Sequence, residues 1–218
     1  MEKIRATVPE GVTLVAVSKT KPISDVREAY DAGQHAFGEN YPQEMRDKHE
    51  ALPGDIQWHF IGHLQTNKIK YIIPFVTLIH SIDSANLLEA VNKEARKHDR
   101  VVDCLLQFHI AQEETKFGLD MDEARALLDS DTFKQMENVR ICGVMGMATF
   151  TDDEIEIRKE FKHLREIFET LRQDYFAGQP QFKEISMGMS EDYPIAIEEG
   201  ATLIRVGSKI FGPRNYNV

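Results

Sequence analysis

The feature of this chain that most constrains its fold is the repeated alternation of short β-like runs with longer helical patterns. Residues 12–18 form an apolar, β-branched run, and residues 23–32 form a helical pattern that Gly33 ends. The later β-like runs are 36–38, 56–61, 75–80, 101–110, 139–145, 182–186 and 201–206. The helical patterns after them are 41–52, 64–73, 84–98, 121–129, 151–175 and 191–199, with a short last one near Lys209.

This alternation predicts the topology of the sheet. Strands that alternate with helices pair in parallel through right-handed crossovers. Eight such units in 218 residues, without a composition break, favour closure into a barrel. We therefore expect a single-domain (β/α)8 TIM barrel over residues 1–218, with an open doubly wound sheet as the alternative.

The charge balance restricts the partners of the chain. It has 26 basic and 36 acidic residues, a formal net charge of −10, whereas nucleic acids and anionic membranes need a positive protein surface. Cys104 and Cys142 lie in apolar runs, as reduced core thiols do. With no secretion signal at the start and no apolar stretch long enough to span a membrane, we expect a cytoplasmic protein without nucleic-acid or membrane partners.

One lysine lies where a barrel carries its site. Barrel enzymes place their sites at the C-terminal ends of the strands, and the first predicted strand ends at Ser18-Lys19. Period-two alternation places Val15, Val17 and Lys19 on one face. A desolvated lysine has a lowered pKa and a free amine suited to Schiff-base chemistry. A solvated loop residue is the alternative reading of Lys19.

The ends of the seventh and eighth predicted strands have the composition of a phosphate site. Ser190 and the pair Gly207-Ser208 each precede a predicted helix, where small residues allow close backbone approach and N–H groups are free. Arg205 shares a face with Gly207 and is expected in the same pocket, with a salt bridge as its alternative role. Each turn alone is a weak signal, because serine is also a common helix N-cap.

Metal binding is not expected. His59 and His63 flank a strand end rather than sharing a helix face, and they lack a nearby acidic ligand. The segment 120–122 lacks the glycine and closing glutamate of a calcium loop. The acidic run 152–154 is best read as a solvated helix start with a capping box from Thr151 to Glu154.

Several sequence blocks resemble the pyridoxal phosphate homeostasis protein family, in the family's order and over nearly the whole chain. They are Val17-Ser18-Lys19-Thr20-Lys21-Pro22, Phe37-Gly38-Glu39-Asn40-Tyr41, Trp58-His59-Phe60-Ile61-Gly62 with Gln65-Thr66-Asn67-Lys68, Ser186-Met187-Gly188-Met189-Ser190, and Arg205-Val206-Gly207-Ser208 with Ile210-Phe211-Gly212. The positions matching the family's cofactor site are Lys19, Asn40, Ser190, Arg205, Gly207 and Ser208.

The resemblance implies a barrel like the N-terminal domain of alanine racemase without that enzyme's second domain. It implies that Lys19 holds pyridoxal 5′-phosphate (PLP) as an imine, that Arg205 faces the pyridine nitrogen and that Asn40 lies near the ring. The other three matched residues hold the phosphate. The family's role is the supply and safe storage of the cofactor, so apo PLP-dependent enzymes are the expected acceptors and we expect a monomer. The chain departs from the family pattern at His63, where proline is expected, and in its short segment before Val12.

Two other functions compete with that of a cofactor carrier. A PLP-dependent amino-acid racemase needs an acid/base group opposite the lysine, and nothing in the sequence places Tyr41 or Tyr216 there. Arg205 stays cationic, so the pyridine ring beside it would be a poor electron sink. A barrel enzyme for another phosphorylated metabolite is the third possibility. These arguments favour the carrier.

Overall fold

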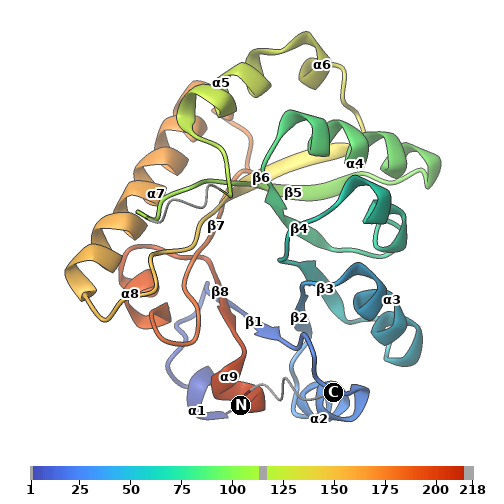
Figure 1. Ribbon diagram of the computed structural model, residues 1–218, viewed down its shortest axis with the longest axis vertical. Coiled ribbons are helices and arrows are strands. Elements are labelled where there is room, and N and C mark those ends of the chain that lie inside the picture. Colours follow the sequence, from blue (N-terminus) through green and yellow to red (C-terminus); the bar gives the residue numbers. More distant parts are fainter. Residues whose placement is uncertain (1, 113–116, 214–218) are drawn as a thin grey trace.

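The computed structural model describes residues 2–112 and 117–213, and its strands form a closed parallel barrel (Figure 1). Each strand pairs with the next one in the sequence, and β1 closes the barrel against β8 with Val15 opposite Arg205. The strands are β1 (Thr13–Val17), β2 (Ala36–Glu39), β3 (Gln57–Phe60), β4 (Leu78–Ile82), β5 (Val102–Gln107), β6 (Val139–Met145), β7 (Glu184–Ser186) and β8 (Leu203–Val206). The TIM-barrel prediction is therefore confirmed.

Helices lie around the outside of this barrel (Figure 1). They are α1 (Glu2–Arg5), α2 (Ile23–Asp31), α3 (Pro42–Ala51), the 3-10 helix η1 (Thr66–Tyr71), α4 (Ala85–Lys97), α5 (Met121–Asp129), α6 (Asp131–Lys134), α7 (Glu154–Asp174), α8 (Tyr193–Glu198) and α9 (Ser208–Phe211). Six residues separate β7 from α8, whereas only Gly207 separates β8 from α9.

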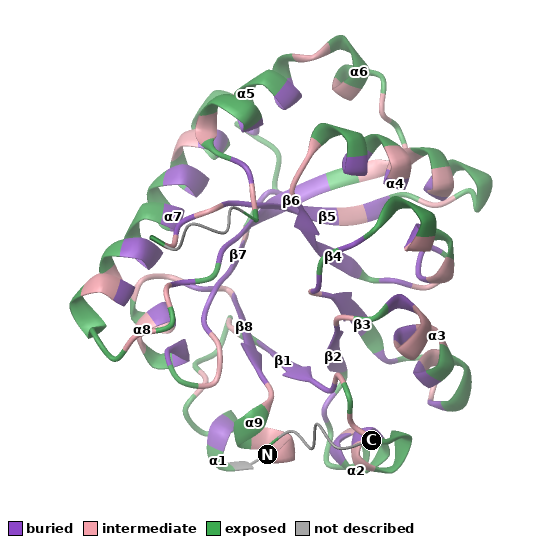
Figure 2. Ribbon diagram, viewed as in Figure 1, coloured by how far each residue is buried: buried purple, intermediate pink, exposed green. Residues whose placement is uncertain are grey.

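The buried apolar side chains form two clusters, one inside the barrel and one between the strands and the helices. The small cluster collects side chains from strands around the barrel, which can meet only in its interior: Val15, Ala36, Leu78, Leu105, Cys142, Met145 and Leu203. The large cluster joins the other strand face to the helices, as Ala16 and Val26 illustrate. The strands are mostly buried and the helices expose their outer faces (Figure 2). Val15 thus lies on the interior face, as the period-two pattern predicted.

The secondary structure predicted for the segment before β4 is wrong. Residues 64–73 were expected to be an α-helix and 75–80 a strand, but the chain forms η1 and its strand starts at Leu78. Hydrogen bonds from Ile72 N to Ile69 O and from Val76 N to Ile72 O continue the turns beyond η1. Pro74 disfavours the α conformation at the residue before it, so a longer helix does not form.

Helix caps also differ from expectation. The N-cap of α7 is Asp153, whose Oδ1 accepts from the backbone N–H groups of Ile155 and Glu156, so the predicted box from Thr151 is wrong. A full capping box is present at α5, between Asp120 and Glu123. Thr151 Oγ1 accepts instead from the backbone N–H of Asp153 at 3.2 Å, outside the helix.

The segment before β1 is short but anchored. Arg5 Nη1 donates to Ala32 O at 2.9 Å, and Thr7 Oγ1 lies 3.0 Å from the Tyr193 hydroxyl. Contacts with the C-cap of α2 and with α8 therefore hold this segment against the barrel.

Cys104 and Cys142 are both free and buried, in agreement with the prediction of core thiols. Within the described residues, no helix is long and apolar enough to cross a membrane.

Candidate functional site

Lys19 lies at the C-terminal end of β1, where the barrel was expected to carry its site. It follows the fully buried Ser18 and is itself half-buried. The next residue, Thr20, has a φ of 64°, in the left-handed region that β-branched residues rarely adopt. The chain therefore makes a sharp, strained turn immediately after Lys19.

The neighbouring lysine has a different environment. Lys21 Nζ donates to Phe211 O at 2.8 Å and to Pro213 O at 3.0 Å, which ties the β1 loop to the end of α9. This amine serves as a structural hydrogen-bond donor. Lys19, the other lysine of this turn, is the residue that the sequence analysis predicts to carry the chemistry.

The structure brings together the ends of β7 and β8. The backbone N–H of Gly207 donates to Ser190 Oγ at 3.2 Å, and Ser208 starts α9 directly after Gly207. A Cβ on Gly207 would lie 3.2 Å from Val17 O and 3.3 Å from Val17 Cβ, so a side chain here would press on the strand that leads to Lys19. Ser190 and Gly207-Ser208 thus meet at one place beside β1.

Arg205 is buried inside the barrel rather than forming a surface salt bridge. Its Nη1 donates to Ser186 Oγ at 2.5 Å and its Nη2 to Gly146 O at 3.1 Å. Within the described residues it forms no ion pair. Burial lowers the pKa of Arg205 to about 10, so the guanidinium still carries its charge at neutral pH.

A series of buried polar side chains connects to Arg205 through Ser186. His59 Nδ1 lies 2.9 Å from His80 Nε2, and His80 Nδ1 lies 2.8 Å from Ser186 Oγ. Burial lowers the pKa of His59 to about 4, and burial together with the charge of Arg205 lowers the pKa of His80 well below its usual value. Both imidazoles are therefore neutral; His59 contacts His80, and His80 in turn contacts Ser186.

Sequence reasoning did not find this chain of groups. His59 was considered only as a metal ligand, and His80 and Ser186 were given no role. The period-two pattern contained the signal, because His80 is two residues after the interior Leu78 and Arg205 is two residues after the interior Leu203. Which interior polar residues touch follows only from the barrel register.

Asn40 follows β2 and carries an unsatisfied acceptor. Its Oδ1 is buried and has no hydrogen-bond partner within the described part of the chain. A Cβ on Gly62 would lie only 2.6 Å from Asn40 O, so Gly62 allows the β3 loop to pack directly on this backbone. A buried acceptor without a partner is suited to a polar group of a ligand.

The residues from 2 to 112 and from 117 to 213 contain no group of three side chains able to hold a metal ion. The two histidines that the sequence analysis considered as metal ligands lie in different environments. His59 is inside the barrel with His80, whereas the exposed His63 lies 3.4 Å from Asp83.

The fold and this site define a barrel of the alanine racemase N-terminal type. The family model described as "Alanine racemase, N-terminal domain" matches residues 1–215. Alanine racemase from Bartonella henselae shares the fold with a TM-score of 0.73 at 15% identity, and the match covers 97% of this chain and 59% of the racemase chain.

More similar proteins define the family further. A pyridoxal phosphate homeostasis protein of Aquifex aeolicus is 40% identical over 204 residues, covering 93% of this chain and 87% of the relative. The corresponding protein of Synechocystis sp. is 37% identical, with 97% and 96% covered. The structure of PipY from Synechococcus elongatus PCC7942 with PLP bound matches with a TM-score of 0.87 at 37% identity, covering 97% of each chain. The chain belongs to the pyridoxal phosphate homeostasis protein family.

Proposed function

We propose that this protein binds pyridoxal 5′-phosphate, holds it covalently on Lys19, and acts in the storage, supply or protection of the cofactor inside the cell. The relatives at 37–40% identity are named for this homeostatic role, and PipY has been solved with PLP bound. The observation that carries the proposal is that the Ser190–Gly207 contact lies against Val17, two residues before Lys19, at the ends of β1, β7 and β8.

The residues at this place fit the cofactor. Bound PLP supplies an aldehyde carbon that a lysine amine attacks. The turn at Gly207 offers close backbone approach to a phosphate, and a side chain there would press on Val17 and displace the turn. The buried Oδ1 of Asn40 is free to accept a hydrogen bond from a group on the ring.

The proposed roles follow this geometry. Ser190, Gly207 and Ser208 hold the phosphate, Asn40 lies near the ring, and Arg205 faces the ring nitrogen. Arg205 keeps its proton, since its pKa of about 10 is still well above neutral. A cationic neighbour disfavours protonation of the ring nitrogen, and an unprotonated ring is a weak electron sink. The site therefore suits a carrier better than an enzyme.

An amino-acid racemase is the alternative function. It needs a second acid/base group opposite Lys19, and the candidates were Tyr41, whose ring is exposed, and Tyr216, which lies outside the described residues. The likeness to alanine racemases at 10–18% identity concerns the fold alone. We therefore propose a cytoplasmic, monomeric carrier that donates PLP to apo-enzymes and has no nucleic-acid or membrane partner.

The visible absorption spectrum of the purified protein, mixed with PLP and freed of excess cofactor, tests this proposal. A band beyond that of free PLP that disappears on treatment with borohydride, together with a mass increase on a peptide containing Lys19, is expected. Absence of any retained cofactor would overturn both the carrier and the racemase, and would leave a barrel for another phosphorylated metabolite.

A further inference from the structure

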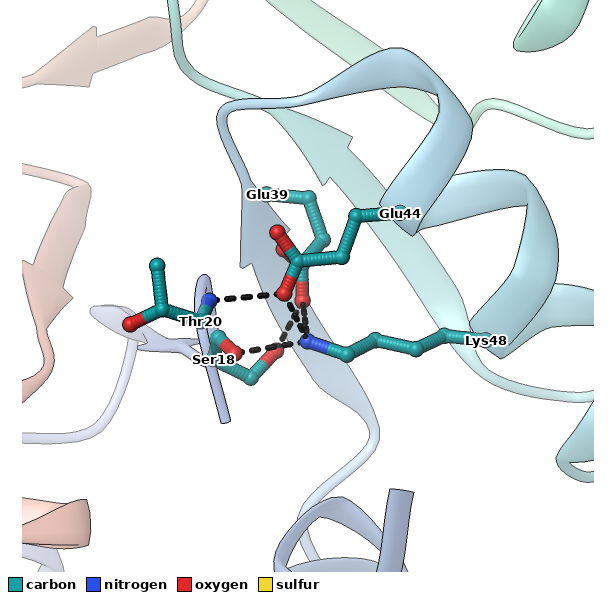
Figure 3. A network of polar contacts seen from close by, with 5 residues as sticks. All are labelled: Ser18, Thr20, Glu39, Glu44 and Lys48. Carbon is teal, nitrogen blue, oxygen red and sulfur yellow. Dashed lines mark hydrogen bonds and ion pairs between the residues drawn. The ribbon is translucent and has the colours of Figure 1, made fainter. Parts of the chain in front are cut away.

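A buried ionic cluster lies on the outer side of the barrel between β2 and α3 (Figure 3). Lys48, on α3, is 3% exposed, and its Nζ donates to Ser18 O, Glu39 Oε1 and Glu44 Oε1, each at 2.7 Å. Glu39 is fully buried at the end of β2. Lysine and glutamate are almost never fully buried unless they are paired, and here Lys48 pairs with both glutamates.

The contacts of this cluster end on both sides of Lys19. Ser18 Oγ donates to Glu39 Oε1 at 2.6 Å, and the backbone N–H of Thr20 donates to Glu44 Oε1 at 2.6 Å (Figure 3). Thr20 is the residue with the left-handed φ of 64°, a conformation that persists only when surrounding contacts hold it. The cluster therefore supplies the contacts that hold the strained turn.

The cluster is also unbalanced in charge. One ammonium faces two carboxylates, and Glu39 Oε2 is buried without a partner within the described residues. Burial raises the pKa of Glu39 to about 7; the charge of Lys48 and the hydrogen bonds from Lys48 and Ser18 lower it, whereas the charge of Glu44 raises it. Protonation of Glu39 would balance the buried charges at one plus and one minus.

We propose that Lys48, Glu39 and Glu44 are positioning residues that fix the backbone on both sides of Lys19 and so present its amine to the cofactor. The inference rests on the proposed function, because it assigns these residues to the same lysine. A buried ion pair is by itself weak support for stability, and the contacts of this one end on an irregular turn rather than on a strand or helix.

The proposal makes the Lys19 turn sensitive to pH. The groups that act on Glu39 are Lys48 and Glu44 of α3 and the Ser18 hydroxyl at the end of β1. Ionised Glu39 attracts Lys48 strongly, whereas neutral Glu39 attracts it less and leaves Lys48 to Glu44. The hydrogen bonds from the cluster to Ser18 and Thr20 therefore change in strength as Glu39 titrates close to neutral pH.

The first experiment uses the cofactor-free protein. In Lys48→Met the two carboxylates lose their counter-charge, and Glu44, which is partly exposed, can turn away from Thr20 into water. We expect hydrogen exchange of the Thr20 amide, followed by NMR, to accelerate about ten-fold or more relative to wild type. Lys97→Met, which removes an exposed lysine paired with Glu94 on α4, is the matched control and should leave this amide unchanged.

The second experiment measures how fast the protein reacts with PLP as a function of pH, through the rise of its visible band. Lys48→Met should react about ten-fold more slowly than wild type or Lys97→Met. Wild type should show an inflection near pH 7 that Glu39→Gln lacks and that Glu44→Gln moves to lower pH, because the charge of Glu44 raises the pKa of Glu39.

The outcomes separate the two proposals. If wild type forms no band, the proposed function fails, and the exchange of Thr20 still decides whether the cluster fixes the turn. If wild type forms the band but Lys48→Met matches it in exchange, rate and pH profile, the positioning role is wrong. Should Lys48→Met not fold, Ser18→Ala, which removes only the hydroxyl that contacts Glu39, replaces it with the same expectations of slower reaction and faster exchange.

Discussion

At the scale of single residues, Lys19 and Lys21 lie in the same turn but in different environments. Lys21 ties the β1 loop to two backbone carbonyls of the chain after α9, whereas Lys19 is held at the site by the turn around it. Their separation by a single residue makes each the natural control for the other.

Lys19→Ala should abolish the visible band of the PLP-loaded protein, because it removes the amine that bonds the cofactor. Lys21→Ala should keep most of the band and lower thermal stability slightly, since it removes hydrogen bonds between loops. Absorption spectra of both variants after removal of free PLP are the measurement. Loss of the band in Lys21→Ala alone would assign the chemistry to the other amine.

The second prediction at this scale concerns the two serines proposed to bind the phosphate. Ser190→Ala and Ser208→Ala each remove a hydrogen bond to a charged group, worth roughly 1.5–3 kcal/mol. Each should weaken retention of PLP about ten-fold or more, as measured by equilibrium dialysis. Ser190→Ala should have the larger effect, because it also removes the acceptor for the Gly207 N–H. Unchanged retention in the double variant would contradict a phosphate site at β7 and β8.

At the scale of secondary-structure elements, the loops after β2 and β3 depend on Gly62. A methyl group there would overlap the Asn40 backbone at 2.6–2.7 Å. Gly62→Ala should lower the free energy of unfolding by about 1–3 kcal/mol and weaken PLP retention through displacement of Asn40. Gly54→Ala is the control, because nothing lies within 4 Å of its added Cβ. Equal denaturation midpoints for the two variants would show that the loops repack freely.

The histidine pair between β3 and β4 makes stability depend on pH. The pKa of His59 is lowered by burial from 6.5 to about 4, so the unfolded state binds more protons in this range. The free energy of unfolding should therefore decrease as the pH falls from 6.5 to 4, by on the order of 3 kcal/mol. This decrease is the contribution of His59, and the lowered pKa of His80 adds a further decrease of the same sign. His59→Gln should remove only the contribution of His59, as followed by urea denaturation at each pH.

Glu39 changes the free energy of unfolding with pH in the opposite direction, so its contribution must be removed from the comparison. Its pKa is raised to about 7, so the contribution of its neutral form is lost as the pH rises through 7. The comparison of His59→Gln with wild type is therefore best made in a Glu39→Gln background. A slope unchanged by His59→Gln in that background would argue against a neutral buried imidazole.

At the scale of the whole molecule, a carrier and an enzyme make different demands on the same barrel. A carrier must release PLP to another amine, whereas an enzyme retains it through many cycles. We expect the loaded protein to restore the activity of an apo PLP-dependent enzyme and to racemise free amino acids negligibly, as measured by chiral chromatography. Sustained racemisation on the order of 1 per second or faster would establish an enzyme.

The barrel itself was predictable from the sequence, because its determinants are local. Most strands are marked by short apolar runs that alternate with helical patterns, and the eight repeats leave few topologies open. The bounds of β6 and α5 agree with prediction at both ends. Prediction erred at η1, where Pro74 and a series of tight turns replaced the expected helix.

Part of the site was predictable for the same reason. Lys19, Ser190 and Gly207 stand at strand ends, and in a parallel barrel all such ends meet at one face. Their positions therefore followed from the strands alone. The resemblance of the sequence blocks to a known family added the identity of the cofactor, which strand positions do not determine.

Only the tertiary structure revealed what holds these residues. Ser186 and His80 are separated by 106 residues, and Lys48 reaches Ser18 across 30 residues. Such contacts depend on the register of the barrel and on the packing of α3 against β2, which no local pattern specifies. The sequence by itself determined the barrel and the strand ends that carry its chemistry. Long-range packing decided which buried charges and imidazoles support Lys19 and Arg205, because burial and pairing arise only when the barrel closes.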